Sequence, residues 1–306
     1  MSLKKVIFLV GPTATGKTRV AVELAGKINA EIISCDSMQI YKGMDIITSK
    51  PQIFLRKKIK HYLIGTVQPE KEYNVSRYRL EALKKIKEIV KKGKTPLFCG
   101  GTGLYVAILI DGIFNAGAQN AALRKKLYRQ LKKYGKDYLY RKLKRFDHKA
   151  AGKIHPNDVK RIVRALEVFE TTGKPISALQ KKREGLSKYY DVKIFCLDMD
   201  RSSLYKRIDE RVDKMFKAGL LKEVKGLLKK KLSKTSRYAI GLSELQGYFA
   251  GRYDLEEAKR LIKRNTRHYA KRQLTWFRKD KRIEWIAIQD KDKPAKVAQR
   301  LWKELY

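Results

Sequence analysis

The chain has 306 residues, 43% of them hydrophobic, which is enough to bury a large core as one domain or as a domain with an insertion. Its 72 lysines and arginines outnumber 31 aspartates and glutamates, and the formal net charge of +41 favours a polyanionic partner such as a nucleic acid. No apolar run approaches the roughly 20 residues of a membrane span, and the three cysteines lie far apart without metal-ligand spacing. We therefore expect a reduced, cytoplasmic protein that contacts no membrane and binds no zinc.

A glycine-rich loop follows the first predicted strand, residues 6–10, whose apolar and β-branched side chains indicate burial. Lys17 in this loop adds a mobile positive charge, Thr18 offers a hydroxyl to a magnesium ion, and the glycines let backbone N–H groups face an anion. Apolar residues at helical spacing continue to Ile28, so the predicted helix directs its positive dipole end at the phosphates. The pattern predicts a phosphate-bearing substrate with Mg²⁺, and it does not separate hydrolase, kinase and transferase chemistry. The loop fits the phosphate-binding pattern Gly-x4-Gly-Lys-Ser/Thr and consists of Gly11, Pro12, Thr13, Ala14, Thr15, Gly16, Lys17 and Thr18.

Strands and helices alternate in the next part of the chain. In chain order we predict a strand at 31–35, a possible strand at 61–64, an amphipathic helix at 73–92 capped by Asn74 or Ser76, and a buried strand at 96–99. Such alternation predicts a parallel sheet with right-handed crossovers. Together with the loop it predicts an α/β fold, with a P-loop NTPase-like parallel sheet flanked by helices.

The sequence pattern changes near Phe114, where the alternation of predicted strands and helices ends. From Gly117 to about Ser187 no strand-like run occurs and the periodicity is helical. We therefore expect an all-helical insertion domain at 117–187 within a catalytic core formed by 1–116 and 188–306. The core resumes with a predicted strand at 192–197, helical stretches at 202–231 and 255–279, a last strand at 283–286 and a closing helix.

Basic and tyrosine side chains are interleaved in the predicted insertion. Examples are Lys125–Tyr128, Lys132–Tyr134 and Tyr138–Lys142. Basic side chains neutralise phosphates and aromatic rings stack on bases, so this pattern favours nucleic-acid binding. High lysine usage on every solvated helix face is the alternative, and it explains part of the excess charge.

Asp36 is the first candidate for catalysis, because it follows the second strand, where open α/β sheets place their chemistry. A carboxylate there could hold magnesium or take a proton from a nucleophile, and the alternative is a turn or helix-capping residue. Thr102, in the glycine turn after the strand at 96–99, would approach the same crevice and offer a hydroxyl to a base or ribose. A tight turn alone explains the glycines equally well.

Two arginine pairs and one aromatic cluster complete the candidates. Arg207 and Arg211 lie four apart on a predicted helix and could close over a polyphosphate, unless nearby aspartates occupy them as surface ion pairs. Arg161 and Arg164 share a helix face in the insertion, and a capped, solvated helix is the alternative. The set Gln273, Trp276, Phe277 and Arg278 is most simply a core tryptophan with flanking surface cations.

Six stretches taken together resemble the bacterial tRNA dimethylallyltransferase family, also called tRNA isopentenyltransferases. They occur in the family's order and span nearly the whole chain, so the set is highly specific. The resemblance implies transfer of the dimethylallyl group from dimethylallyl diphosphate to N6 of the adenosine at tRNA position 37, beside the anticodon, in tRNAs that read codons beginning with U. It also implies Mg²⁺ as the cofactor. The stretches are GPTATGKT at Gly11–Thr18, SCDSMQIYKGMDI at Ser34–Ile46, CGGTGLY at Cys99–Tyr105, IHPNDVKRIVRALEVF at Ile154–Phe169, RIDERVDKMFKAGL at Arg207–Leu220 and RQLTWFRK at Arg272–Lys279.

The resemblance also implies roles for individual residues. The phosphate loop would hold the diphosphate, Asp36 would be the general base at the adenine N6, and Arg211 would neutralise the leaving diphosphate. With Lys17 and with Thr18 on the metal side, these residues form the implied catalytic set. Contacts to the tRNA are implied at Asp36, Ser37, Met38, Gln39, Thr102, Arg124, Lys160, Arg161, Ile162, Val163 and Arg164.

The chain departs from the family pattern at Ile47, at Gly65 and in a run that contains Leu242 and Ser243. These positions concern tRNA affinity more than the reaction. A P-loop small-molecule kinase shares the strand and loop but needs no basic insertion, and an adenylate isopentenyltransferase acting on free nucleotides should lack much of it. The expected partners are the tRNA anticodon stem-loop and dimethylallyl diphosphate, and we expect a monomer. The set of tRNAs and the use of a hydroxylated prenyl donor stay open.

Overall fold

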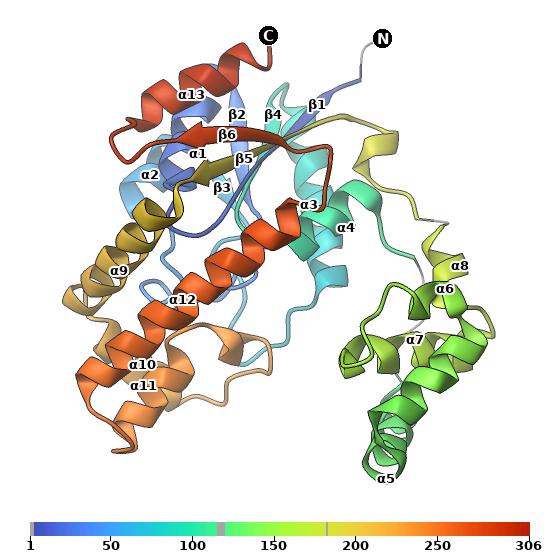
Figure 1. Ribbon diagram of the computed structural model, residues 1–306. Coiled ribbons are helices and arrows are strands. Elements are labelled where there is room, and N and C mark those ends of the chain that lie inside the picture. The colour runs from blue at the N-terminus through green and yellow to red at the C-terminus, as the bar shows by residue number, and fades with distance from the viewer. Residues whose placement is uncertain (1–2, 115–119, 182) are drawn as a thin grey trace. The chain divides into compact units, whose positions relative to one another are not determined.

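The computed structural model describes residues 3–114, 120–181 and 183–306 (Figure 1). The chain divides into two compact units, one formed by Met1–Ile110 with Tyr189–Tyr306 and the other by Asp111–Lys188. Each unit has its own hydrophobic core. The boundary expected between residues 116 and 117 lies outside the described residues.

The larger unit is built on a six-stranded sheet in which every pair of neighbouring strands is parallel. The strand order is β3-β2-β4-β1-β5-β6, so the first strand lies in the middle of the sheet. This architecture confirms the predicted α/β fold and brings the carboxyl ends of β1, β2 and β4 to one edge. The strands are β1 (Lys5–Val10), β2 (Ala30–Ser34), β3 (His61–Tyr62), β4 (Thr95–Cys99), β5 (Asp191–Met199) and β6 (Glu284–Ile288).

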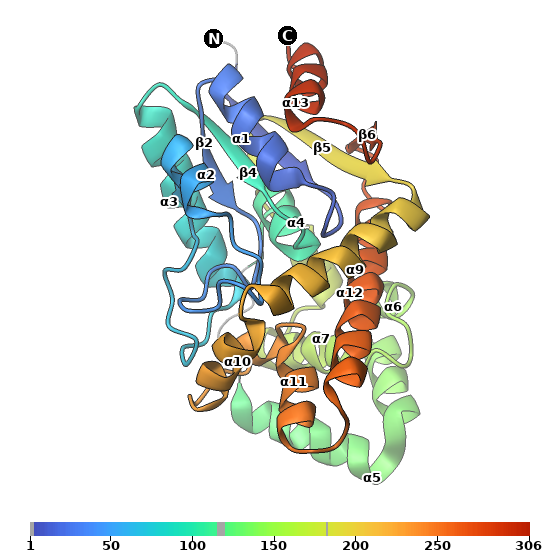
Figure 2. The same ribbon diagram turned by 90° about the vertical axis from the view of Figure 1, so that its left-hand side faces the viewer.

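Helices cover both faces of the sheet (Figure 2). One face buries a cluster from the strands against α1 (Lys17–Lys27), the N-terminal half of α9 (Arg201–Lys217) and α13 (Pro294–Lys303). On the other face the rings of Phe8 and Phe98 stack at 4.5 Å. The helix α3 (Val75–Lys91) contacts β2 and β4 there, and Tyr78 of α3 stacks on Tyr105 of α4 (Gly103–Asp111). The phosphate loop therefore begins from a central strand of the sheet that is buried from Val6 to Val10.

The predicted amphipathic helix at 73–92 corresponds to α3, and Asn74 is its cap, because the Asn74 side chain accepts a hydrogen bond from the Arg77 backbone N–H at 2.9 Å. Leu80 of α3 is 66% exposed, so this apolar side chain lies outside the buried face of the helix. The helical stretch expected at 202–231 is two helices, since Gly219 interrupts it at a φ of 97°. The remaining helices of this unit are α2 (Ile53–Lys58), α10 (Leu220–Leu228), α11 (Leu242–Phe249) and α12 (Leu255–Phe277).

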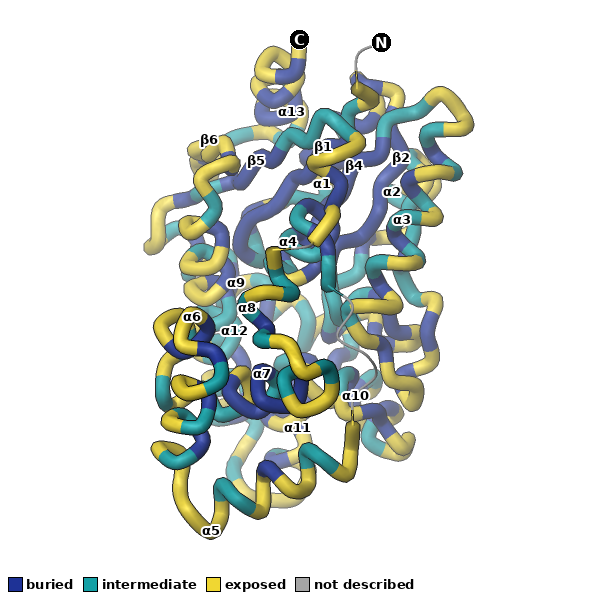
Figure 3. Tube along the Cα trace, turned by 90° about the vertical axis from the view of Figure 1, so that its right-hand side faces the viewer, coloured by how far each residue is buried: buried dark blue, intermediate teal, exposed yellow. Residues whose placement is uncertain are grey.

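The smaller unit contains only helices among its described residues. Its core gathers apolar side chains of α5 and α7, and α7 is its most buried element (Figure 3). The long α5 is interrupted at Gly135, whose φ is 78°. Its helices are α5 (Ala121–Phe146), α6 (His148–Ala151), α7 (Val159–Thr172) and α8 (Ile176–Gln180). Across the residues that the structure describes in both units, no helix combines the length and apolar character of a membrane span.

Candidate active site

The phosphate loop connects β1 to α1 in the conformation that its sequence predicts. Gly16 caps α1 in the left-handed region at a φ of 82°. Gly11 has a φ of 139°, and a Cβ atom on it would lie 2.7 Å from the carbonyl oxygen of Leu197 in β5. The side chain of Thr15 is buried and donates to the Pro12 carbonyl at 3.0 Å, which closes the loop on itself. The two glycines are therefore required by backbone geometry, and the loop stands preformed at the N-terminus of α1.

Lys17 lies inside this loop, with its ammonium 2.5 Å from the Pro12 carbonyl oxygen. The pKa of Lys17 is lowered from 10.5 to about 8, chiefly by burial and also by the nearby positive charge of Arg211, while the negative charge of Asp36 opposes both effects. An ammonium held without a carboxylate partner gains strongly from a bound anion. Lys17 is thus placed to meet a phosphate group.

Arg211 reaches the phosphate loop from α9. Its guanidinium donates to the hydroxyl of Thr13 at 3.0 Å and to the hydroxyl of Ser49 at 2.9 Å. Burial lowers its pKa, and the charge of Asp36 raises it. Both partners are neutral, and no ion pair to Arg211 occurs within the described part of the chain. The guanidinium therefore keeps its charge available to an anion at the loop.

The neighbouring arginine and aspartates of α9 have other partners. Arg207 pairs with Asp290, Asp209 with Arg267, and Asp213 with Lys263. The alternative of surface ion pairs thus holds for Arg207 but not for Arg211.

Asp36 follows β2 directly after Cys35, at the carboxyl edge of the sheet. One carboxylate oxygen accepts hydrogen bonds from the backbone N–H groups of Met38 at 2.8 Å and of Gln39 at 3.3 Å. The other oxygen has no hydrogen-bond partner among the described residues, and Asp36 forms no ion pair with them. Asp36 therefore does have the turn-forming role that was the alternative to catalysis. Its second carboxylate oxygen is still available to accept a proton.

Thr102 and Ser37 meet beside Asp36. The Thr102 hydroxyl accepts from the Ser37 backbone N–H at 3.0 Å and lies 3.4 Å from the Ser37 hydroxyl. Burial together with the negative charge of Asp36 raises the pKa of Tyr269 of α12. The glycine turn is held close by Gly100, where a Cβ atom would lie 2.3 Å from the Cys35 carbonyl oxygen. The structure thus places Thr102 in contact with Ser37, the residue that follows Asp36, at the carboxyl edge of the sheet.

Gln273 joins the two halves of the site, which the sequence reasoning did not foresee. Its side-chain oxygen accepts from the Thr13 backbone N–H at 2.9 Å, and its amide nitrogen donates to the Gly101 carbonyl at 2.9 Å. Gln273 is 5% exposed, whereas Trp276, expected in the core, is 40% exposed. The expectation of a core tryptophan is wrong, because the buried face of α12 here carries Gln273 and Phe277. The only sequence feature that pointed to this role is that Gln273 is an uncharged polar residue within a long basic helix.

The residues implied to contact tRNA in the helical unit differ in their surroundings. Glu167 is only 1% exposed, and its carboxylate pairs with the guanidinium groups of Arg124 at 2.9 Å and of Arg164 at 2.7 Å. Both arginines therefore hold a buried carboxylate, and about a third of each side chain remains exposed. Arg161 is 62% exposed and pairs with Asp158, the capping residue of α7.

Ile162 and Val163 belong to the core of the helical unit and are 0% and 2% exposed. Their side chains are buried, so at these two positions the implied contact with tRNA stays a prediction that only the backbone could fulfil. Lys160 is exposed at the N-terminal end of α7. The helix thus turns residues 162 and 163 inward and residues 160 and 161 outward, as its spacing requires.

The departures from the family pattern lie around one loop. A Cβ atom on Gly241, the residue before Leu242 and Ser243, would lie 3.4 Å from side-chain atoms of Ile47. A Cβ atom on Gly65 would lie 3.4 Å from the ammonium of Lys50. The departing positions therefore surround residues 47–50 and leave the phosphate loop untouched.

The donors available to a metal ion are few. Within the described ranges, no three His, Cys, Asp or Glu side chains gather as a metal site. Thr18 is half-buried at the start of α1. A hydroxyl beside a phosphate loop fits Mg²⁺, which keeps several waters and takes other oxygens from substrate phosphates.

The fold and the site together define a P-loop protein that acts on a phosphate-bearing substrate. The features that define it are the parallel sheet, the phosphate loop with its lysine, the arginine that faces this loop, and the carboxylate of Asp36 at the same edge of the sheet. The comparisons with known proteins agree with this class. The IPP transferase family model matches residues 39–280, and the isopentenyl transferase model matches residues 4–66. The chain belongs to the IPP transferase family.

Relatives cover nearly the whole chain. The tRNA dimethylallyltransferase of Acetivibrio thermocellus is 45% identical over 98% of this chain and 96% of its own length. The tRNA dimethylallyltransferase of Halothermothrix orenii is 47% identical over 94% and 88%. Among solved structures, the tRNA isopentenylpyrophosphate transferase of Bacillus halodurans matches with a TM-score of 0.72 at 39% identity, covering 99% of this chain and 97% of its own. A eukaryotic dimethylallyltransferase acting on tRNA matches with a TM-score of 0.82 at 31% identity, covering 97% and 77%.

Proposed function

We propose that the protein transfers the dimethylallyl group of dimethylallyl diphosphate to N6 of the adenosine at tRNA position 37, in tRNAs that read codons beginning with U. The observation that carries this proposal is the separation of charge at the sheet edge. Among the residues that the structure describes, one carboxylate oxygen of Asp36 has no hydrogen-bond partner, and Lys17 and Arg211, which face the phosphate loop, have no acidic partners. One side of the site suits a proton acceptor and the other suits a polyanion.

The chemistry follows from these two sides. The lone pair of the adenine N6 is delocalised into the ring, so the amine is a weak nucleophile until a proton is removed. The bond from N6 to C1 of the dimethylallyl group forms as the bond from C1 to the diphosphate oxygen breaks, and the N6 proton passes to Asp36. Lys17 and Arg211 stabilise the negative charge that develops on the departing diphosphate.

Magnesium enters the proposal at Thr18, whose hydroxyl would hold the ion against the diphosphate. The ion would supply further neutralisation of the leaving group. The loop amides around Thr15 and Gly16 bind the same oxygens through backbone N–H groups. Thr15, Gly16 and Thr18 would thus orient the diphosphate, in addition to any charge that the magnesium ion neutralises.

The acceptor is proposed to be tRNA and not a small molecule. The relatives are named as enzymes of tRNA, and the helical unit exposes Lys160 and Arg161 at the start of α7. An adenine stacked in the anticodon loop cannot reach a site at a sheet edge, so the base must be flipped out. A kinase or an enzyme of free nucleotides has no use for this basic helical unit. We further propose that the protein acts as a monomer in the cytoplasm.

The test uses dimethylallyl diphosphate labelled in the prenyl group with unmodified tRNA. Label should enter the RNA and be released by nuclease digestion as N6-(dimethylallyl)adenosine. A tRNA with guanosine at position 37 is the matched control and should stay unlabelled. Label in free adenosine monophosphate but not in tRNA, or phosphate transfer from ATP to a small acceptor, would overturn the proposal.

A further inference from the structure

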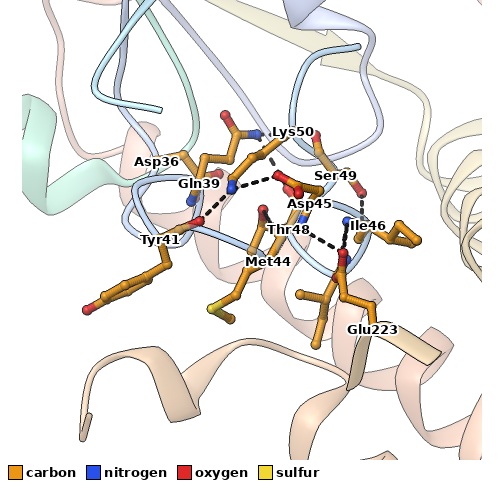
Figure 4. A network of polar contacts seen from close by, with 11 residues as sticks. Asp36, Gln39, Tyr41, Met44, Asp45, Ile46, Thr48, Ser49, Lys50 and Glu223 are labelled. Atoms are coloured by element: carbon orange, nitrogen blue, oxygen red, sulfur yellow. Dashed lines mark hydrogen bonds and ion pairs between the residues drawn. The ribbon is translucent and has the colours of Figure 1, made fainter. Parts of the chain in front are cut away.

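The carboxylate of Glu223 has no part in the site described above, yet it binds three consecutive backbone N–H groups (Figure 4). Glu223 lies in the first turn of α10 and accepts from Asp45 at 2.9 Å, from Ile46 at 2.9 and 3.1 Å, and from Ile47 at 2.8 Å. Successive N–H groups that converge on one anion form a nest, and bonds to a carboxylate are stronger than neutral ones. Glu223 therefore fixes the turn at residues 45–49 to α10.

Hydrogen bonds lead from this turn to the carboxylate of Asp36. The side-chain nitrogen of Gln39 lies within hydrogen-bond distance of the carbonyl oxygens of Thr48 at 3.4 Å and of Ser49 at 3.3 Å. The backbone N–H of Gln39 donates to Asp36 at 3.3 Å. A displacement of the turn is thus passed through one side chain to the segment that orients the open oxygen of Asp36.

The same turn also reaches the arginine at the phosphate loop. The hydroxyl of Ser49 accepts from Arg211 at 2.9 Å, and the backbone of Ser49 is held in the left-handed region at a φ of 48°. A non-glycine residue keeps such a conformation only where its surroundings enforce it. The position of the turn therefore influences both the base and the cation that faces the leaving group.

We propose that Glu223 is a positioning residue for the transfer reaction, which sets the geometry between Asp36 and Arg211 through the turn at residues 45–49. The proposal rests on the proposed function, and Glu223 itself touches no reacting atom. Reaction between two bound substrates needs the attacking amine and the leaving diphosphate in line, and a misplacement of about 1 Å can cost roughly 10²-fold in rate. Substrate affinity depends much less on such a displacement.

The variant that tests this is Glu223→Gln, which keeps the shape and removes the charge. The turn keeps other bonds in this variant, because Lys50 pairs with Asp45 at 2.8 Å and the Thr48 hydroxyl donates to the Met44 carbonyl at 2.5 Å. We expect the single-turnover rate to fall about 10- to 100-fold, while the dissociation constants of tRNA and prenyl diphosphate change less than about threefold.

Glu72→Gln is the matched control. Glu72 is likewise a carboxylate that binds a distant segment, accepting from the Lys234 backbone N–H at 2.9 Å and from the Thr235 hydroxyl at 2.8 Å. We expect both variants to lose similar thermal stability but only Glu223→Gln to lose rate. An equal loss of rate in Glu72→Gln would overturn the proposal, because it would mean a general loss of stability.

A double-mutant cycle with Asp36→Asn separates positioning from an independent effect. If Glu223 acts through the geometry between Asp36 and Arg211, Glu223→Gln should lower the residual rate of Asp36→Asn by a smaller factor than it lowers the rate of the wild type. Full additivity of the two losses would overturn the proposal. Wild-type protein assayed in parallel distinguishes the two claims, since absence of prenyl transfer by wild type refutes the proposed function instead.

Discussion

The depressed pKa of Lys17 predicts how binding of the diphosphate depends on pH. With a pKa of about 8, Lys17 is about nine-tenths charged at pH 7 and about one-tenth charged at pH 9. A bound diphosphate favours the charged lysine, so its association constant should fall up to about tenfold over this interval. An organic diphosphate is already ionised there, since phosphate groups titrate near pH 6, and the change therefore reports on the protein.

Two charge-removing variants should move the midpoint of this profile in opposite directions. Arg211→Met removes a positive charge that lowers the pKa of Lys17, so the midpoint should move to higher pH. Asp36→Asn removes a negative charge that raises this pKa, so the midpoint should move to lower pH. The assay is titration calorimetry with dimethylallyl diphosphate without tRNA, from pH 6.5 to 9.5 at fixed ionic strength. A flat wild-type profile, or shifts of the same sign in both variants, would refute the reasoning.

The same pKa has a consequence for stability, with a defined sign. Between pH 8 and pH 10.5 the unfolded state binds more protons at Lys17 than the folded state does, so the contribution of Lys17 to the free energy of unfolding rises with pH in that window. Lys17→Met should remove this rise. Thermal melts of both proteins across the window provide the measurement.

Three further predictions concern separate parts of the molecule. Asp36→Asn should lower the single-turnover rate by roughly two to four orders of magnitude with tRNA affinity intact in filter binding, and a rate near wild type would remove Asp36 from the mechanism. Lys160→Ala with Arg161→Ala should flatten the slope of log affinity against log salt by about one to two units, and an unchanged slope would place the RNA elsewhere. Gly100→Ala should cost roughly 3 kcal/mol or more in chemical denaturation, because a Cβ atom would lie 2.3 Å from the backbone oxygen of Cys35; wild-type stability would show that the turn can relax.

Much of the fold could be predicted from local sequence patterns. The strand before the phosphate loop, the loop itself and the cap at Asn74 depend on residues close in sequence, and their predictions are confirmed. The position of Asp36 was also accessible, because the carboxyl ends of parallel strands meet at one edge of a sheet. Short-range periodicity thus suffices wherever one segment determines its own structure.

Long-range polar contacts were not accessible in this way. Gln273 and Glu223 look like ordinary polar residues of basic helices. The partners of Gln273 lie 260 and 172 residues away, and those of Glu223 lie 176 to 178 residues away. Arg124 and Arg164 were assigned to tRNA by resemblance alone, and their bonds to the buried Glu167 required the tertiary packing of α5 against α7. The sequence shows where a basic residue lies, but it does not show whether that residue pairs with a carboxylate of the protein or with a phosphate of the RNA.

The central position of β1 has a consequence for biosynthesis. One edge of β1 pairs with β5, from Lys5 opposite Asp191 to Val10 opposite Cys196. At about 5–20 residues per second, a ribosome needs on the order of 10–40 s to advance from one strand to the other. The segment translated meanwhile includes the whole helical unit, Asp111–Lys188, which is contiguous and can fold as it emerges. The edge of β1 that pairs with β5 therefore stays open on the nascent chain during that interval, even after β4 has paired with the other edge, and such edges attract other chains. We expect chaperone contact with the nascent protein to peak before β5 is made and to decline once it pairs.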